Sequence, residues 1–456
     1  KAELFAQYAR NKRIQLGRLK EEIEQNYPDY FQLKYTNQPL TIRQTRETLL
    51  DPQTALLEFS FGPERGFVFV ISPTSATMIP LQIDSTLLQT LQAFKTELFQ
   101  TEKFELDPAQ AYLDFNRLAF ALQEQLLGDA LATLPTSIQH LIIVPDGPLN
   151  TLPFEVLNTE PVSKASTDFA QLPYLLKQYQ IQYAYSARLL GKNREQQQRL
   201  AANINCLAFA PSYATSRPIA QRSLRANQIR SGITALAFTA EEIEAIHAQF
   251  SGTFESGAVA TKAEFLQLAG QFGILHLAMH GEADFEQPKF GHLIFSNMGL
   301  APEQNLLYNY EIAQLNLQAQ LAVLSACETG IGKYEAGEGV FSLARSFMYA
   351  GVPSIIMSLW KVNDRSTSSL MPLFYQQLAT GKNKALALQS AKLAFLETAE
   401  PEHRHPFYWS GFVAMGSAQA LQMKKSQPIF YSLLAILLLS AGIAWNYRQR
   451  SLNKEN

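Results

Sequence analysis

The sequence predicts an α/β protein in which a mostly parallel sheet is flanked by helices. Two observations indicate this fold class. Short apolar segments alternate with helical segments of about 10 to 15 residues, which is typical of βαβ units. Two of the apolar segments, residues 273–279 and 320–325, are followed by His280 and Cys327. Because open α/β sheets carry their chemistry beyond the carboxyl ends of the strands, we expect both side chains on one edge.

The N-terminal third is expected to form two separate portions. Residues 1–40 are predicted to be a charged amphipathic helix that caps a helical repeat array upstream of Lys1. Residues 41–135 are predicted to be an α+β portion with a β-hairpin, because two alternating apolar segments are separated by a Gly- and Pro-containing turn. Its expected elements are helices at 42–50, 87–99 and 109–127 and strands at 54–60 and 66–72.

The α/β region is predicted to cover residues 136–420. Its expected strands are 140–144, 180–184, 204–210, 273–279, 320–325 and 354–360, with a further short one at Phe254. Its expected helices are 239–249, 262–271, 338–349, 367–378 and 384–396. Since the strands alternate with helices, the sheet should be mostly parallel.

The C-terminal segment changes character. Residues 429–445 carry no charge, and the length of this segment is at the short end of the roughly 17 to 25 residues that span a bilayer. We therefore expect a transmembrane helix at 428–447, a short basic tail at 448–456, and a single-pass membrane protein. Positive charges flank both ends of the apolar segment and favour neither orientation of this helix, so the main domain is expected on either side of the membrane.

Composition excludes several functions. The formal net charge of −2 and the absence of a basic stripe argue against nucleic acid as a partner. The two cysteines argue against a disulfide framework, and no Cys/His cluster has metal-ligand spacing, so we expect no metal and no cofactor. Cys206 lies within an apolar segment and is interpreted as a core thiol.

Cys327 and His280 are candidates for a nucleophile and its base. A thiol peptidase also needs donors for the oxyanion, and the backbone N–H groups of Gly281 and Cys327 are the candidates, because glycine lets the backbone approach a substrate closely. The alternative for His280 is a hydrogen-bonded loop histidine. His276 shares a strand face with His280 and is interpreted as a structural histidine.

Several ordered motifs resemble the CHAT domain, a caspase-like module often attached to tetratricopeptide repeats, and more distantly the separase and caspase peptidases. In caspases the His also precedes the Cys by about 50 residues. The resemblance covers roughly residues 40–420. It is carried by 144–155 (VPDGPLNTLPFE), 276–281 (HLAMHG), 324–330 (LSACETG), 337–347 (GEGVFSLARSF), 350–354 (AGVPS) and 358–364 (SLWKVND), with 51–59 (DPQTALLEF) upstream.

The resemblance implies a caspase-like fold in which His280 and Cys327 are the catalytic pair. Residues 359–364 are similar to the separase segment that shapes the pocket for the residue before the scissile bond, so Trp360 and Asp364 are candidate pocket residues. An acid there favours Arg or Lys. The alternative for Asp364 is a helix N-cap. The glycine-containing loop 330–339 is a candidate gate.

The sequence therefore predicts a membrane-tethered cysteine endopeptidase that cleaves protein or peptide substrates. Activation by a signal, or by a protein partner bound through upstream repeats, is expected from the resemblance. The alternative is a non-catalytic CHAT interaction or signalling scaffold. A nucleotide-binding enzyme is disfavoured because no glycine-rich phosphate-binding motif follows a strand.

Overall fold

The computed structural model describes residues 39–62, 65–213, 239–284, 287–296, 302–325, 333–335, 339–341 and 343–423, together with single positions between 12 and 25. The chain up to Leu421 forms one compact unit. Cys327, most of the predicted gate loop and the predicted span at 428–447 lie outside the described residues.

The centre of this unit is an 11-stranded sheet. Its strands are β1 (Thr54–Phe61), β2 (Arg65–Ile71), β3 (Ala76–Gln82), β4 (His140–Val144), β5 (Gln180–Tyr183), β6 (Cys206–Pro211), β7 (Gly252–Gly257), β8 (Ile274–Leu277), β12 (Leu321–Leu324), β15 (Ser354–Ser358) and β16 (Phe412–Gly416). The order is β3-β2-β1-β4-β5-β16-β15-β12-β8-β6-β7. Antiparallel pairing is confined to β1 with β2, β2 with β3, and β15 with β16. The predicted mostly parallel sheet is thus confirmed.

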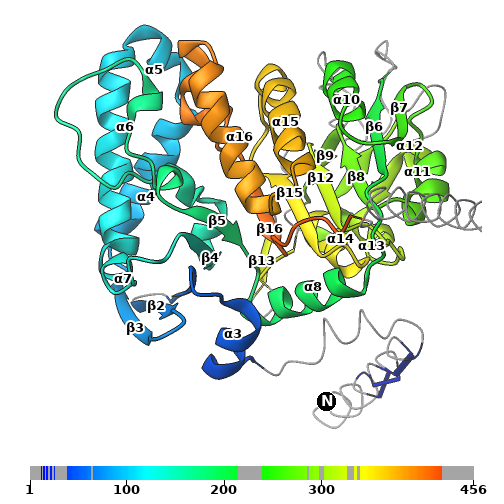
Figure 1. Ribbon diagram of the computed structural model, residues 1–456, viewed down its shortest axis with the longest axis horizontal. Helices are drawn as coiled ribbons and strands as arrows, with labels where there is room; N and C mark the ends of the chain where they lie inside the picture. The colour runs from blue at the N-terminus through cyan, green and yellow to red at the C-terminus, as the bar shows by residue number, and fades with distance from the viewer. Residues whose placement is uncertain are drawn as a thin grey trace, which may run out of the picture. The chain divides into compact units, whose positions relative to one another are not determined.

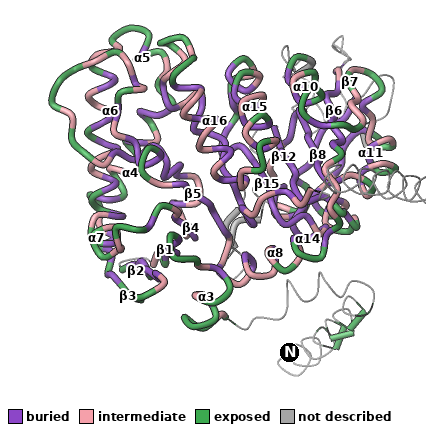
Figure 2. The backbone as a smooth tube through the Cα atoms, viewed as in Figure 1, coloured by how far each residue is buried: buried purple, intermediate pink, exposed green. Residues whose placement is uncertain are grey.

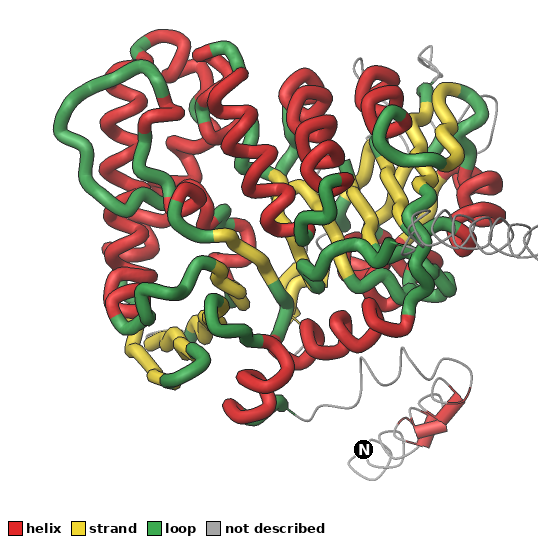
Figure 3. The backbone as a smooth tube through the Cα atoms, viewed as in Figure 1, coloured by secondary structure: helices red, strands yellow, loops and turns green. Residues whose placement is uncertain are grey.

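Helices cover both faces of this sheet (Figure 1). The helices α10 (Thr239–His247), α15 (Asp364–Ala379) and α16 (Lys384–Thr398) lie on one face, and α8 (Ala187–Arg199) and α14 (Leu343–Tyr349) on the other. Figure 3 shows the strands as a yellow layer between these red helices. The remaining helices are α3 (Ile42–Leu49), α4 (Ser85–Phe99), α5 (Thr101–Leu106), α6 (Pro108–Gln123), α7 (Asp129–Ala132), α11 (Lys262–Leu268), α12 (Pro302–Asn305) and α13 (Asn309–Ile312).

The inner strands form the hydrophobic core because they are apolar on both sides. All residues of β8, β12, β15 and β16 are buried, as Figure 2 shows in purple for the middle of the sheet. Strands covered by helices on both faces read as continuous apolar runs, which explains how the sequence revealed most of them.

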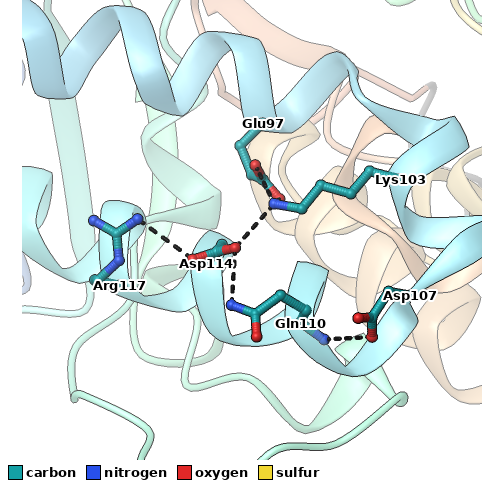
Figure 4. A network of polar contacts seen from close by, with 6 residues as sticks. All are labelled: Glu97, Lys103, Asp107, Gln110, Asp114 and Arg117. Carbon is teal, nitrogen blue, oxygen red and sulfur yellow. Dashed lines mark hydrogen bonds and ion pairs between the residues drawn. The ribbon is translucent and has the colours of Figure 1, made fainter.

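The predicted N-terminal α+β portion extends the same sheet. Its β-hairpin, β1 with β2, is continued by β3, and β1 pairs in parallel with β4. Helices α4, α5 and α6 are held together by an ion-pair network (Figure 4). There Lys103 Nζ lies 2.7 Å from Glu97 and 3.0 Å from Asp114, and Arg117 lies 3.4 Å from Asp114. These groups are partly exposed, so each pair contributes little to stability.

One predicted helix was placed too early. The sequence predicts a helix at 338–349, but α14 begins at Leu343. Before it, β14 (Gly339–Phe341) pairs with β13 (Lys333–Glu335). Gly339 lies in the first turn of the predicted helix and disfavours it, because glycine loses the most conformational freedom on becoming helical.

The expected single-pass membrane localisation is corrected by the structure. Among the residues that the structure describes, no helix is both long and apolar enough to cross a membrane. The apolar segment 429–445, on which that expectation was based, is outside this set.

A buried lysine makes the stability of the fold dependent on pH. Lys384, the first residue of α16, has no exposed surface, and its Nζ donates to Oε1 of Gln197 at 2.9 Å. Burial lowers the pKa of Lys384 to about 7 from its usual 10.5. The folded state therefore binds fewer protons than the unfolded state between pH 7 and 10.5, and its stability rises with pH across that window.

We expect Lys384→Met to remove this dependence. Relative to the variant, the free energy of unfolding of the wild type should increase by about 3 kcal/mol between pH 7 and pH 9.5, at roughly 1.4 kcal/mol for each pKa unit. Urea unfolding of both proteins at the two pH values measures the difference. A difference that does not change with pH would contradict the shifted pKa.

Candidate active site

The carboxyl ends of β8 and β12 meet at one edge of the sheet. The two strands are parallel neighbours, and their last residues, Leu277 and Leu324, are register partners. His280 follows the end of β8 by the same number of residues as Cys327 follows the end of β12. Cys327 itself lies outside the described residues, so its contact with His280 stays a prediction.

His280 begins a small second sheet directly beyond β8. This three-stranded sheet contains β9 (His280–Glu282), β10 (His292–Ile294) and β11 (Leu306–Tyr308). His280 is 8% exposed, and its backbone N–H donates to the hydroxyl of Tyr213 at 3.0 Å. The ring of Tyr213 packs against the imidazole with centroids 5.0 Å apart. The candidate base is therefore held at a strand end, in a mostly buried position.

Gly281, the predicted oxyanion donor, is the second residue of β9. It is buried and lies opposite Leu293 of β10. Its proposed partner, the amide of Cys327, lies outside the described residues, and the oxyanion role stays a prediction.

Trp360, predicted to line the substrate pocket, lies in an aromatic cluster. It is 4% exposed, and its indole N–H donates to the carbonyl of Phe407 at 3.2 Å. Its ring lies 5.4 Å from the ring of Phe99, which is 48% exposed. In this position Trp360 supports the segment that leads to Asp364, and its direct contact with a substrate remains a prediction.

Asp364 is the first residue of α15, which follows β15 at the same edge of the sheet. The alternative interpretation of Asp364 as the helix cap is wrong, because Asn363 is the N-cap and its side chain accepts the N–H of Ser366. Burial raises the pKa of the Asp364 carboxyl, and the charges of His280 and Lys361 oppose that shift. Asp364 therefore lies within electrostatic range of the candidate base, and its carboxyl is not used for capping.

His276 is built into the core instead of the site. It is fully buried in β8, and its Nδ1 lies 3.0 Å from the hydroxyl of Tyr375 on α15. Oε1 of Glu242 on α10 lies 3.1 Å from Nε2, in ion-pair contact but without the alignment of a hydrogen bond. These contacts tie β8 to the two helices, which is the structural role that the sequence predicted.

The second cysteine contrasts with the candidate nucleophile. Cys206 is fully buried at the start of β6, and burial raises its pKa. Since the thiolate is the reactive form, Cys206 should react slowly with alkylating reagents.

Two residues near the site were not predicted from the sequence. Tyr213 follows β6, and Glu242 is a charged residue in the first turn of α10. Neither residue belongs to a recognisable sequence motif. The one available signal was that Tyr213, like His280, comes shortly after a buried strand. Within the described part of the chain, no group of three or more His, Cys, Asp or Glu side chains is arranged to hold a metal ion.

Parts of the chain are similar to known proteins. A family model described as CHAT domain matches residues 116–417. Tetratricopeptide repeat protein 28 of Homo sapiens is 29% identical over 124 residues, which is 27% of this chain and 5% of that protein. The Mus musculus protein of the same name is 28% identical over 121 residues, 26% of this chain and again 5% of that protein. The chain thus spans a small part of the length of these relatives.

A solved structure shares the fold. One chain of the Saccharomyces cerevisiae separase–securin complex matches 82% of this chain and 30% of its own length, with a TM-score of 0.51 and 10% identity. A second structure of that complex gives a TM-score of 0.50 at 11% identity, covering 82% of this chain and 31% of the other. At such low identity the likeness shows a shared α/β fold, with a large, mostly parallel sheet flanked by helices.

Proposed function

Because the chain belongs to the CHAT domain family, as the resemblance predicted, we propose that it is a cysteine endopeptidase in which Cys327 is the nucleophile and His280 the base. The register of the two strands that precede these residues supports the proposal most strongly. Leu277 and Leu324 are register partners in the parallel strands β8 and β12. His280 follows Leu277 by the same number of residues as Cys327 follows Leu324. Neighbouring strands lie about 4.8 Å apart, so the two strands end side by side.

The proposed reaction is a two-step acyl transfer. His280 takes the proton of the Cys327 thiol, and the thiolate attacks the peptide carbonyl to form a tetrahedral oxyanion. The N–H groups of Gly281 and Cys327 stabilise that charge. His280 then gives the proton to the leaving amine, and a thioester remains on Cys327. Water, deprotonated by His280, hydrolyses the thioester and restores the thiol.

Asp364 supports a preference for Arg or Lys before the scissile bond. It lies beyond β15, the other parallel neighbour of β12, so it follows the same sheet edge at which the strand before the proposed nucleophile ends. Burial raises its pKa, which indicates a partly desolvated position. A carboxylate in such a position binds a cationic side chain more strongly than an exposed one.

We expect Asp364→Asn to relax this preference. The value of kcat/KM for peptides with Arg or Lys before the cut should fall about 10- to 100-fold, which corresponds to a charged hydrogen bond of roughly 1.5 to 3 kcal/mol. Peptides with neutral residues there should change little. A peptide library that varies this position, with the full chain and its Asp364→Asn and Cys327→Ala variants, measures both effects. Asp114→Asn, in the network of Figure 4, is the matched control.

The library also tests the proposed function. If the wild type cleaves library peptides and Cys327→Ala does not, the result supports the proposed peptidase activity. Cleavage that persists in Cys327→Ala would contradict the assignment of the nucleophile. If the wild type cleaves nothing and its two cysteines alkylate equally slowly, the chain is better described as a CHAT interaction scaffold.

Activation by a protein partner is part of the proposal. The curated relatives are named for tetratricopeptide repeats, and the matched segment is 5% of their length. Arrays of such repeats form extended binding surfaces. A partner bound to repeats that are joined to this chain would regulate the site from outside the catalytic unit.

A further inference from the structure

Tyr213 connects two opposite backbone groups at the candidate site. Its hydroxyl accepts the N–H of His280 at 3.0 Å and donates to the carbonyl of Ile294 at 2.9 Å. Tyr213 lies just after β6, the parallel neighbour of β8, so it reaches the site from the same edge of the sheet.

These two backbone groups belong to residues that face each other. His280 of β9 and Ile294 of β10 are register partners in an antiparallel pair. In such a pair the N–H of one residue commonly bonds directly to the carbonyl of the other. Here the hydroxyl of Tyr213 bonds to both groups. The first residue of β9 is therefore held by a side chain that follows β6.

The aromatic ring of Tyr213 fixes the same residue from a second direction. Its centroid lies 5.0 Å from that of the imidazole, with an angle of 47° between the ring planes. Tyr213 is 8% exposed and packs with Ile294 and Leu306 in a small apolar cluster of its own. The ring is thus held in place independently of His280.

We propose that Tyr213 is a positioning residue for the base, a role that rests on the proposed function. Its hydroxyl holds the backbone of His280, and its ring limits the rotation of the imidazole. A displacement of about 1 Å in a catalytic group lowers rates by as much as about 100-fold. Loss of the hydroxyl alone should therefore reduce the chemical step.

The chain provides a matched control in Tyr375. Its hydroxyl also bonds to a histidine in this region, but to the ring of His276, which the site does not use. Tyr375→Phe and Tyr213→Phe each remove one buried hydroxyl and keep the ring. Both variants should lose some stability, and only Tyr213→Phe should alter the site.

The test compares the full wild-type chain with both variants in three measurements. The first measurement determines kcat and KM separately for a cleaved peptide. The second follows the rate of iodoacetamide reaction at Cys327 as a function of pH. The third is an NMR titration of histidine-labelled protein, in which the His280 resonances are assigned by comparison with His280→Ala. For Tyr213→Phe we expect kcat to fall about 10- to 100-fold with KM nearly unchanged. The pH profile and the His280 resonances should shift. Tyr375→Phe should match the wild type in kcat, in KM, in the pH profile and in the His280 resonances, and should shift only the resonances of His276.

Two outcomes would overturn the proposal. The first is a Tyr213→Phe variant whose kcat, pH profile and His280 resonances equal those of Tyr375→Phe, since Tyr213 would then be structural only. The second concerns a chain without peptidase activity. If the wild type neither cleaves nor shows a reactive Cys327, the proposed function fails, but the NMR titration still decides whether Tyr213 positions His280. Unchanged His280 resonances in Tyr213→Phe would contradict it.

Discussion

Replacement of His280 by Ala is expected to lower kcat/KM by about 10³-fold or more. General acid and base catalysis contributes typically about 10² to 10⁴ in rate, and His280 is proposed to serve in both steps of the reaction. The side chain is mostly buried at the start of β9. Steady-state kinetics with the best library peptide provides the measurement.

The control for this substitution is His247→Ala. His247 is exposed at the end of α10 and packs against Phe254 of β7, the edge strand of the sheet. It should retain wild-type kinetics. Retention of activity in His280→Ala, with an unchanged fold by circular dichroism, would assign the base elsewhere.

Replacement of Glu155 by Gln is expected to destabilise the fold by roughly 3 to 5 kcal/mol. Glu155 lies in the short helical turn Phe154–Val156, where its Oε1 is 3.2 Å from Nζ of Lys392 on α16. Tyr183 donates its hydroxyl hydrogen bond to the same carboxylate. The side chains of Glu155 and Lys392 are 3% and 1% exposed.

The physical reason is the charge left behind. Burial lowers the pKa of Lys392, and the carboxylate of Glu155 acts against that shift. Without the carboxylate, the ammonium of Lys392 is either an uncompensated buried charge or must lose its proton. Both alternatives cost free energy, so the urea midpoint should fall strongly.

The comparison variant is Asp114→Asn, which breaks the partly exposed network of Figure 4. Exposed pairs contribute about 1 kcal/mol or less, so its midpoint should change little. Equal effects of Glu155→Gln and Asp114→Asn would contradict the distinction between a buried and a surface pair. Glu155 belongs to the motif that carried the family resemblance, and its environment assigns it a structural role.

The sequence predicted the elements that are long or continuously apolar. Strands such as β8, β12 and β15 are buried on both faces, so their apolar runs are visible without a structure. The residues that follow them identified one sheet edge as the candidate site. That His280 and Cys327 follow register partners could not be predicted, because register depends on pairing between distant segments.

Elements that depend on tertiary pairing were missed. The strand β16 (Phe412–Gly416) lies between β15, to which it is antiparallel, and β5, to which it is parallel, although its sequence is short and carries no turn signal of a hairpin. The sheet of β9, β10 and β11 consists of three-residue strands, which are too short for a period to be recognised. Tyr213 escaped notice for the same reason, since its bonds join β6 to that sheet.

The central claim is that His280 activates Cys327, and the relative alkylation rates of the two cysteines test it without a substrate. The full chain and its His280→Ala variant are treated with iodoacetamide at neutral pH, and modification at each thiol is followed by mass spectrometry. Cys206 is fully buried and serves as the internal reference. The account predicts that Cys327 reacts much faster than Cys206 and that His280→Ala removes most of that advantage. Equal Cys327 rates in the wild type and in His280→Ala would contradict it.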